Sequence, residues 1–163
     1  MDKLTFTGEI IKARGGHKGL RIPGRNDLVT GPPDWPEQLF AGSLNILIVD
    51  AGYPEEFRAR QIPLTVKSLD IAGFAPEFTI PQGMMGNNML KATQEMPKRG
   101  AAQIWRAALV ANGHNIECWL LRRFGSGLEH ELELVSKEGI RSTYGLPESV
   151  NWPAIVHVFG RWS

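Results

Sequence analysis

Cysteine is nearly absent from this sequence: Cys118 is the only one, so no internal disulfide can form. It lies within the apolar run at 116–121, which predicts that it fills the core of a protein from a reducing compartment. Long apolar runs are missing too. No stretch reaches the roughly 18 apolar residues that a membrane-spanning helix needs, and the first residues lack the apolar segment of a secretory signal. These absences predict a cytoplasmic protein with no membrane partner.

The chain also lacks an excess of charge of either sign. It has 18 Lys and Arg against 17 Asp and Glu, which gives a formal net charge of +1. A broad nucleic-acid interface is normally basic, so we do not expect nucleic acid as a partner, although a local anion site is compatible with this balance. No Pro-rich or Ser-rich linker divides the 163 residues, which predicts one domain over 1–163 and leaves the oligomeric state open.

Short apolar segments recur along the chain between 18 glycines and 11 prolines. Their composition and alternation are typical of β-strands. The predicted strands span 4–12, 43–49, 64–71, 78–80, 104–111, 115–122, 131–135 and 154–159. Helical signals are few, at 36–40, 54–60 and 137–144. The sequence therefore predicts a mainly β fold, a small barrel or sandwich with a few short helices.

One hairpin can be predicted in detail. The runs at 104–110 and 116–121 are joined through Asn112 and Gly113, a pair that favours a type I′ turn. Trp105 and Trp119 are expected to lie near each other across this hairpin, either as an aromatic pair in the core or as a stacking wall for a ring-shaped ligand. The pair at 122–123, two arginines, is interpreted as a solvated strand end.

A candidate cation site lies at the start of the strand predicted at 43–49. Successive side chains of a strand point to opposite faces, so Ser43 and Asn45 share one face. A hydroxyl and an amide carbonyl are hard oxygen donors, and as a weak pair they suit Mg²⁺, which keeps several waters and completes its shell with substrate phosphates. The alternative is that the two residues merely cap an ordinary strand.

A candidate anion site precedes it. Residues 12–26 contain five Lys or Arg, one His and no acid. The glycines at 15, 16 and 19 let the backbone approach a ligand closely, and their amides and the flanking cations could surround a polyphosphate. The spacing is neither that of a P-loop nor that of a dinucleotide-binding fingerprint. A solvated, glycine-bearing turn is the alternative interpretation.

The order of these segments resembles that of the archaeal-type CTP-dependent riboflavin kinases. The similarity extends over residues 6–158 and includes Gly-Glu-Ile-Ile at 8–11, the glycine loop, Phe-Ala-Gly-Ser-Leu-Asn-Ile at 40–46, the middle hairpin, Glu-Leu-Glu-Leu-Val-Ser at 131–136, Ile-Arg at 140–141 and Gly-Leu-Pro-Glu at 145–148. The resemblance implies a six-stranded cradle-loop β-barrel. It also implies transfer of the γ-phosphoryl of CTP to riboflavin, giving FMN, with Mg²⁺ as the cofactor.

The resemblance also implies roles for individual residues. It assigns the metal to Ser43 and Asn45, and contact with the flavin to Glu133. It assigns nucleotide binding to two segments, Arg14, Gly15, Gly16, His17 and Lys18 in the loop, and Glu138, Gly139, Ile140 and Arg141 after the late strand. From the residues alone, Glu133 has another interpretation, since alternation of Glu131 and Glu133 with leucines is the pattern of a strand with one wet face.

The chain departs from the family pattern at three places. Gly16 and Gly19 are displaced from the family's glycine positions, Gly125 stands where a flavin-contacting threonine is expected, and Pro-Glu-Ser at 147–149 replaces an Asp-Gly-Asp turn. The insert at 82–100 is longer than the family pattern, and no catalytic base is identified. These departures leave two alternatives open, a catalytically inactive barrel that binds a nucleotide or flavin, and an interaction protein without a ligand.

Overall fold

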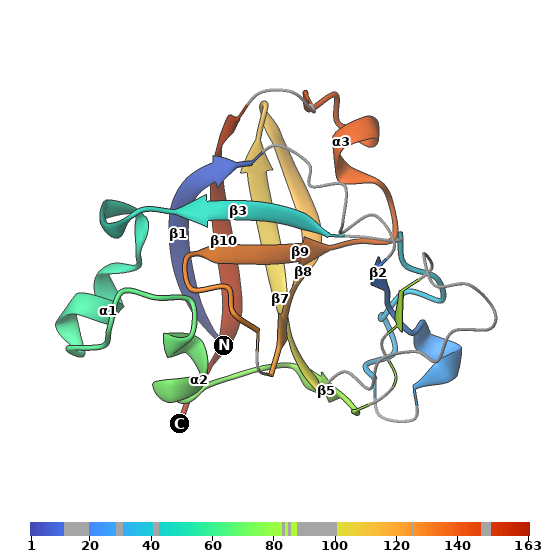
Figure 1. The fold of residues 1–163 in the computed structure, drawn as a ribbon, viewed down its shortest axis with the longest axis horizontal. Coiled ribbons are helices and arrows are strands. Elements are labelled where there is room, and N and C mark those ends of the chain that lie inside the picture. Colours follow the sequence, from blue (N-terminus) through green and yellow to red (C-terminus); the bar gives the residue numbers. More distant parts are fainter. Residues whose placement is uncertain are drawn as a thin grey trace.

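The computed structural model describes residues 1–11, 20–28, 31–40, 43–82, 84, 86–87, 101–124, 126–147 and 151–163. Its centre is a closed barrel of six antiparallel strands (Figure 1). In ring order these strands are β1 (Asp2–Ile10), β3 (Leu44–Ile48), β9 (Glu131–Val135), β8 (His114–Arg123), β7 (Ala102–Ala111) and β10 (Trp152–Trp162). Because β10 pairs with both β1 and β7, the ring has no gap. The predicted mainly β, six-stranded barrel is confirmed.

The remaining elements are short. The helices are α1 (Glu55–Ala59), α2 (Ser68–Ile71) and α3 (Ile140–Thr143), with 3₁₀ turns η2 (Arg25–Asp27) and η3 (Asp50–Gly52). β5 (Phe78–Ile80) pairs with the first residues of β7, and β4 (Phe74–Ala75) pairs with the end of β10. A separate two-stranded ladder joins β2 (Leu20–Arg21) to β6 (Gly86–Asn87). None of the helices in the described ranges is long and apolar enough to cross a membrane.

Alternation along the strands separates two hydrophobic cores. The larger fills the barrel, where Phe6 is fully buried and packs edge-on against Tyr53 and Phe57, with ring centroids 6.0 and 5.8 Å away. The smaller, called here the outer core, lies on the opposite face of the strands. It consists of Ile22, Trp35, Ile80, Ala102, Ile104, Trp119, Leu121 and Val135.

The outer core is closed by residues 20–28 and 31–40, called here the cover segment. Trp35 is its anchor: the ring is fully buried, lies 4.9 Å from the ring of Trp119, and donates from Nε1 to the carbonyl of Pro23 at 3.0 Å. Arg106 ties the same segment to β7 through a bidentate ion pair with Asp34. The cover segment therefore packs against the outside of the barrel as a fixed layer.

The predicted hairpin is confirmed, including its turn. Asn112 and Gly113 have φ values of 49° and 75°, the positive pair that a type I′ turn requires. The aromatic pairing across it was wrong. Trp105 is opposite Leu120, and Trp119 is opposite Arg106, so the two indoles point to opposite faces. Both belong to hydrophobic cores, Trp105 inside the barrel and Trp119 in the outer core.

Two local predictions were also wrong. Residues 64–71 form turns and α2 instead of a strand, because Val66 and Leu69, three residues apart, are the two apolar residues buried there, and this spacing is helical. Residues 36–40 form no helix. Within that stretch the amide of Phe40 bonds to the carbonyl of Ser136 at 2.9 Å, which draws the chain along the barrel. The helix predicted at 54–60 is confirmed as α1, and the one predicted at 137–144 is present only over the four residues of α3.

Candidate functional site

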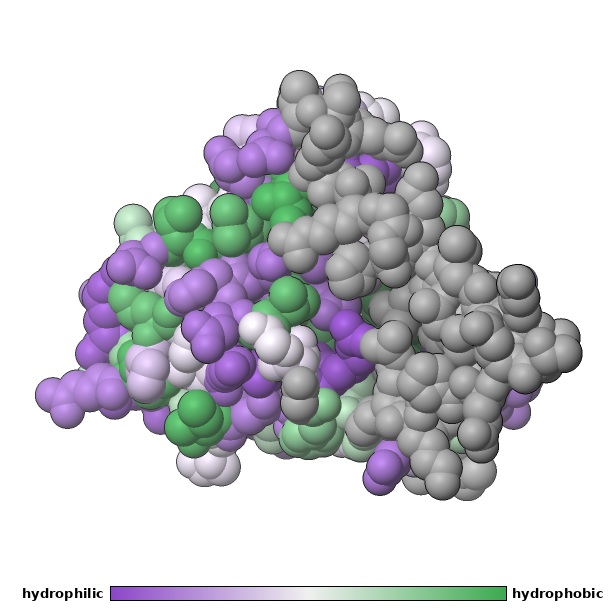
Figure 2. Space-filling model, viewed as in Figure 1, coloured by the Kyte–Doolittle hydropathy of each residue, from purple (hydrophilic) through white to green (hydrophobic). Residues whose placement is uncertain are grey.

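The candidate site lies on the outer face of β3 and β9, where these strands run side by side. Asn45 is directly opposite Glu133, and Leu47 is opposite Glu131. The intervening residues Leu44, Ile46, Leu132 and Leu134 point into the barrel. The same alternation that builds the core thus leaves one amide and two carboxylates together on the other face. On the face of the molecule in Figure 2, hydrophilic and hydrophobic residues are interspersed over the described surface.

Three side-chain oxygens meet beside the start of β3. The hydroxyl Oγ of Ser43 lies 3.3 Å from Oδ1 of Asn45 and 3.3 Å from Oε2 of Glu133. Asn45 is 8% exposed and Glu133 is 3% exposed, so this group is largely shielded from water. It is called here the oxygen cluster: Ser43, Asn45 and Glu133.

Two further charged residues border the oxygen cluster. Nη2 of Arg123 lies 3.4 Å from Oε1 of Glu133, and Nδ2 of Asn45 lies 3.5 Å from Oε1 of Glu131. The side chain of Arg123 is 16% exposed, and its Nε is buried without a hydrogen-bond partner among the described residues. The interpretation of Arg123 as a solvated strand end was therefore wrong. Its alternation with Leu121 and Trp119, both on the outer face, is the sequence signal that could have located it.

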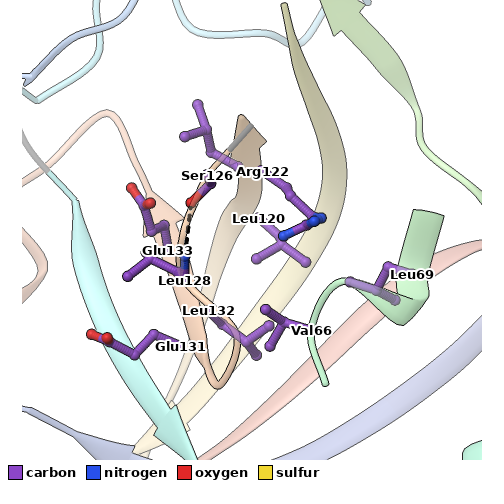
Figure 3. Close-up of a pocket in the computed structure, with 10 residues that line it drawn as sticks. Val66, Leu69, Leu120, Arg122, Ser126, Leu128, Glu131, Leu132 and Glu133 are labelled. Atoms are coloured by element: carbon purple, nitrogen blue, oxygen red, sulfur yellow. Dashed lines mark hydrogen bonds between the residues drawn. The ribbon is translucent and has the colours of Figure 1, made fainter. Parts of the chain in front are cut away.

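A small pocket of about 10 Å³, with room for about one water molecule, adjoins the cluster. It is lined by α2, the end of β8 and the start of β9. Figure 3 shows the carboxylates of Glu131 and Glu133 turned to the same side, away from Val66 and Leu69. Arg122 also lines the pocket and forms an ion pair with Asp70, in which Nε of Arg122 donates to Oδ2 of Asp70 at 2.7 Å. The pocket thus has an apolar wall on one side and carboxylates on the other.

The second predicted nucleotide segment lies at the end of the barrel where β1 ends and β3 begins. The guanidinium of Arg141 donates to the carbonyls of Pro147 and Ile11, and the amide of Ile11 donates to the carbonyl of Asn45 at 3.1 Å. Ile140 is 6% exposed and packs in the barrel core, so its side chain does not reach a ligand, and its carbonyl accepts from the amide of Tyr144 at 3.1 Å. Glu138 is exposed, and its amide bonds to Oγ of Ser136 at 3.4 Å. Gly139 precedes α3 and packs close to the ring of Phe40.

The first predicted nucleotide segment lies outside the described residues. This holds for Arg14, Gly15, Gly16, His17 and Lys18, as it does for Gly125 and most of the 82–100 insert. The described chain stops at Ile11, which is hydrogen-bonded to the Asn45 backbone, and resumes at Leu20 in β2.

The described histidines are engaged elsewhere on the barrel. Nδ1 of His130 lies 2.7 Å from the hydroxyl of Tyr53, and Nδ1 of His157 lies 3.0 Å from Oγ1 of Thr5. Burial, with a smaller contribution from the charge of Lys3, lowers the pKa of His157. The ring of His114 packs beside that of Tyr144 at a centroid distance of 5.2 Å. These contacts are structural.

The donor set at Ser43 and Asn45 fits Mg²⁺. Mg²⁺ binds oxygen at about 2.0–2.1 Å in octahedral geometry, so neighbouring ligand oxygens stand about 3 Å apart. The separation of 3.3 Å between Oγ of Ser43 and Oδ1 of Asn45 is within a few tenths of an ångström of that value. The described residues contain no group of three or more His, Cys, Asp or Glu arranged for a metal. A cation here would therefore be held by Ser43 and Asn45 together with at most the one carboxylate beside them, that of Glu133.

A scan of the chain against protein-family models finds no match, and a search of curated proteins finds none.

Proposed function

We propose that this protein is a Mg²⁺-dependent riboflavin kinase of the cytoplasm, which transfers the γ-phosphoryl of CTP to the 5′-hydroxyl of riboflavin and gives FMN. The observation that carries the proposal is the pair of oxygens at Ser43 and Asn45, which lie 3.3 Å apart at the start of β3. These are the two positions that the sequence resemblance assigns to the metal. A six-stranded barrel is the fold that the same resemblance implies.

Phosphoryl transfer depends on positioning and on neutralising charge, so the residues need to hold reactants more than to react with them. Bound Mg²⁺ would supply neutralisation of the β- and γ-phosphate charge. Ser43 and Asn45 would hold it at the end of the barrel. The basic loop with Arg14, His17 and Lys18, together with its glycine amides, would surround the phosphates, and the segment at 138–141 would contact the rest of the nucleotide.

The acceptor side of the proposal lies at the pocket beside β9. The pocket itself is too small to enclose a planar ring, so the flavin would lie outside it, against Glu133 at its edge, the residue that the resemblance assigns to the flavin. The pocket lies next to the oxygen cluster because Glu133 belongs to both. This adjacency would bring a riboflavin hydroxyl near a phosphate bound at Ser43 and Asn45.

A second function, a catalytically inactive barrel that binds a nucleotide or flavin, is favoured by the environment of Glu133. Its carboxylate is only 3% exposed and is directed at Ser43 and Arg123, which leaves little of it to meet a flavin. The sequence also favours this alternative, because Gly125 stands where the family resemblance leads us to expect a flavin-contacting threonine.

Incubation of the purified protein with riboflavin, CTP and MgCl₂, with FMN separated by chromatography, tests the proposal. We expect FMN to form, and Asn45→Ala to lower turnover by about 100-fold or more, because a catalytic metal contributes several kcal/mol to the transition state. Asn115→Ala, which removes an exposed amide from β8, is the matched control and should keep full activity.

The outcomes separate the two functions. Undiminished turnover in Asn45→Ala would refute the metal assignment. Calorimetry that detects tight binding of CTP or riboflavin, with no FMN after prolonged incubation, would select the inactive barrel. Repeating the assay with ATP tests the preference for the cytosine base.

A further inference from the structure

The oxygen cluster contains a third donor that the metal pair does not use, Oε2 of Glu133. We infer that Glu133 is a direct ligand of the divalent cation, alongside Ser43 and Asn45, and that Arg123 is the positioning residue that fixes its carboxylate. The inference rests on the proposed function only for the identity of the metal site. It gives Glu133 a different role from contact with the flavin.

The distances within the cluster are those of ligands around a shared ion more than those of hydrogen bonds. Oγ of Ser43 is 3.3 Å from both Oδ1 of Asn45 and Oε2 of Glu133. Hydrogen bonds from a hydroxyl to oxygen normally span about 2.5–3.0 Å. A serine hydroxyl also has a single proton, so it can satisfy only one of these two acceptors at a time. Two acceptor oxygens thus converge on one weak donor, an arrangement that a cation would complete.

The same separation indicates the class of cation. Oxygen ligands at right angles around Mg²⁺ stand about 3.0 Å apart, and around Ca²⁺, with bonds of about 2.3–2.6 Å, they stand about 3.3–3.7 Å apart. The value of 3.3 Å is a few tenths of an ångström above the Mg²⁺ separation and equals the lower end of the Ca²⁺ range. The site therefore suits a hard divalent cation of this size range, held by a hydroxyl, an amide carbonyl and one carboxylate.

Because the carboxylate of Glu133 is buried, it has lost hydration that a bound cation would replace. Glu133 is 3% exposed, and a buried carboxylate needs a cation or hydrogen-bond donors to offset its lost hydration. Arg123 offsets part of this through Nη2 at 3.4 Å from Oε1. Oε2, on the other side, faces only the shared hydroxyl of Ser43 among the contacts that the structure shows. Arg123 thus holds one oxygen and leaves the other beside the hydroxyl of Ser43, which also lies next to Oδ1 of Asn45.

The carboxylate changes what the site can do without a nucleotide. A hydroxyl and an amide alone depend on substrate phosphates to complete a Mg²⁺ shell, whereas an added carboxylate supplies the charge that hard cations prefer. The consequence is that the protein alone, with no nucleotide present, should bind one divalent ion at this position.

Titration of the nucleotide-free protein with Mn²⁺, followed by the electron paramagnetic resonance signal of the free ion, tests this inference. We expect one bound Mn²⁺ per chain, displaced by excess Mg²⁺. Glu133→Gln, which keeps the shape and removes the charge, should weaken Mn²⁺ binding at least tenfold. Glu117→Gln removes the same charge from an exposed position of β8 and should leave the affinity unchanged.

A second variant covers the case in which Glu133→Gln does not fold, as judged by circular dichroism and thermal melting. Ser43→Ala, at a half-buried position, removes another ligand without touching the ion pair, and it too should weaken Mn²⁺ binding at least tenfold. Failure of the folded wild-type protein to bind Mn²⁺ without nucleotide would overturn the inference, and so would wild-type affinity in a folded Glu133→Gln protein or, if that variant does not fold, in Ser43→Ala.

The test is independent of the kinase assay. If the wild type binds Mn²⁺, Glu133→Gln loses this binding and the wild type forms no FMN, then Glu133 is a metal ligand and the proposed kinase function is refuted. Formation of FMN with no Mn²⁺ bound in the absence of nucleotide would do the reverse.

Discussion

Replacement of Arg123 by Met should destabilise the protein by about 3 kcal/mol, because it strips the buried Glu133 carboxylate of its cation. The two side chains are 16% and 3% exposed, and Nη2 lies 3.4 Å from Oε1. At an effective dielectric constant of about 20, charges at this distance attract by about 5 kcal/mol, and most of that attraction only offsets the desolvation of both groups. Loss of one partner therefore exposes the desolvation cost of the other. The residual exposure of Arg123 places the expected value at the lower end of the usual 3–5 kcal/mol.

The assay is equilibrium unfolding in urea, with the free energy of unfolding extrapolated to water. Glu133→Gln should cost less than Arg123→Met, about 2 kcal/mol, because the freed guanidinium is the more exposed partner and water can reach it. The double variant should be more stable than the sum of the two losses predicts, by about 1–2 kcal/mol, since it leaves no uncompensated charge. Arg161→Met removes an exposed arginine from β10 and should change stability by less than about 0.5 kcal/mol.

Additive losses in the double variant would refute this reasoning, because they would mean that the two charges do not interact. A loss below about 1 kcal/mol in Arg123→Met would also contradict it, since the pair would then behave as an exposed one.

Two further predictions concern the layers around the site. Gly24→Ala should cost about 1–3 kcal/mol and loosen the cover segment, seen as a shift in tryptophan fluorescence on urea unfolding, because the new Cβ would stand 1.8 Å from the carbonyl oxygen of Glu37. Gly127→Ala, whose Cβ would meet nothing within 4 Å, is its control, and equal effects in both would contradict the packing argument. Burial raises the pKa of the Cys118 thiol to about 12, so the native thiol stays protonated where an unfolded one ionises, near pH 9. The contribution of Cys118 to the free energy of unfolding is therefore full below pH 9 and falls as the pH rises toward 12. A thiol reagent at pH 8 should label the native protein only as fast as the protein unfolds. Faster labelling would contradict this prediction, because it would show that Cys118 is accessible in the folded protein.

The strands of the barrel could be predicted from the sequence because they carry their own signals, whereas their closure into a six-stranded barrel instead of a sandwich was implied only by the family resemblance. Alternation of apolar and polar residues marks the strands, and Asn112 with Gly113 fixes the turn and register of the one hairpin that is strictly local. Where the apolar spacing was irregular the prediction failed. Val66 and Leu69 lie in an apolar run that looks like a strand, yet Val66 is in the turn before α2 and Leu69 is in α2, and their separation lets both pack in the barrel core.

Only one part of the candidate site could be predicted from the sequence, the pair Ser43 and Asn45, which are close together in the chain. The period of two puts Ser43 and Asn45 on one face whatever the partner strand is. The approach of Glu133 to Ser43 depends on the register of β3 against β9, which are far apart in the chain, and no feature of either strand alone determines it. The role of Arg123 was hidden for the same reason: a pair of arginines at a strand end looks solvated until the carboxylate of the neighbouring strand is placed beside one of them.

The pairing of β1 with β10 has a consequence for how the molecule assembles. Residues Asp2 and Gly160 are partners at this seam, so it joins segments from opposite ends of the chain. Bringing together ends about 150 residues apart costs about 4 kcal/mol of chain entropy before the first contact forms, whereas the hairpin of β7 and β8 needs only its two-residue turn. We therefore expect the local hairpins to form early and the seam to form last. Until β10 pairs with β1 and β7, each of these two strands has one edge with unpaired backbone groups. We expect pairing between two chains to compete with closure of the barrel at this step.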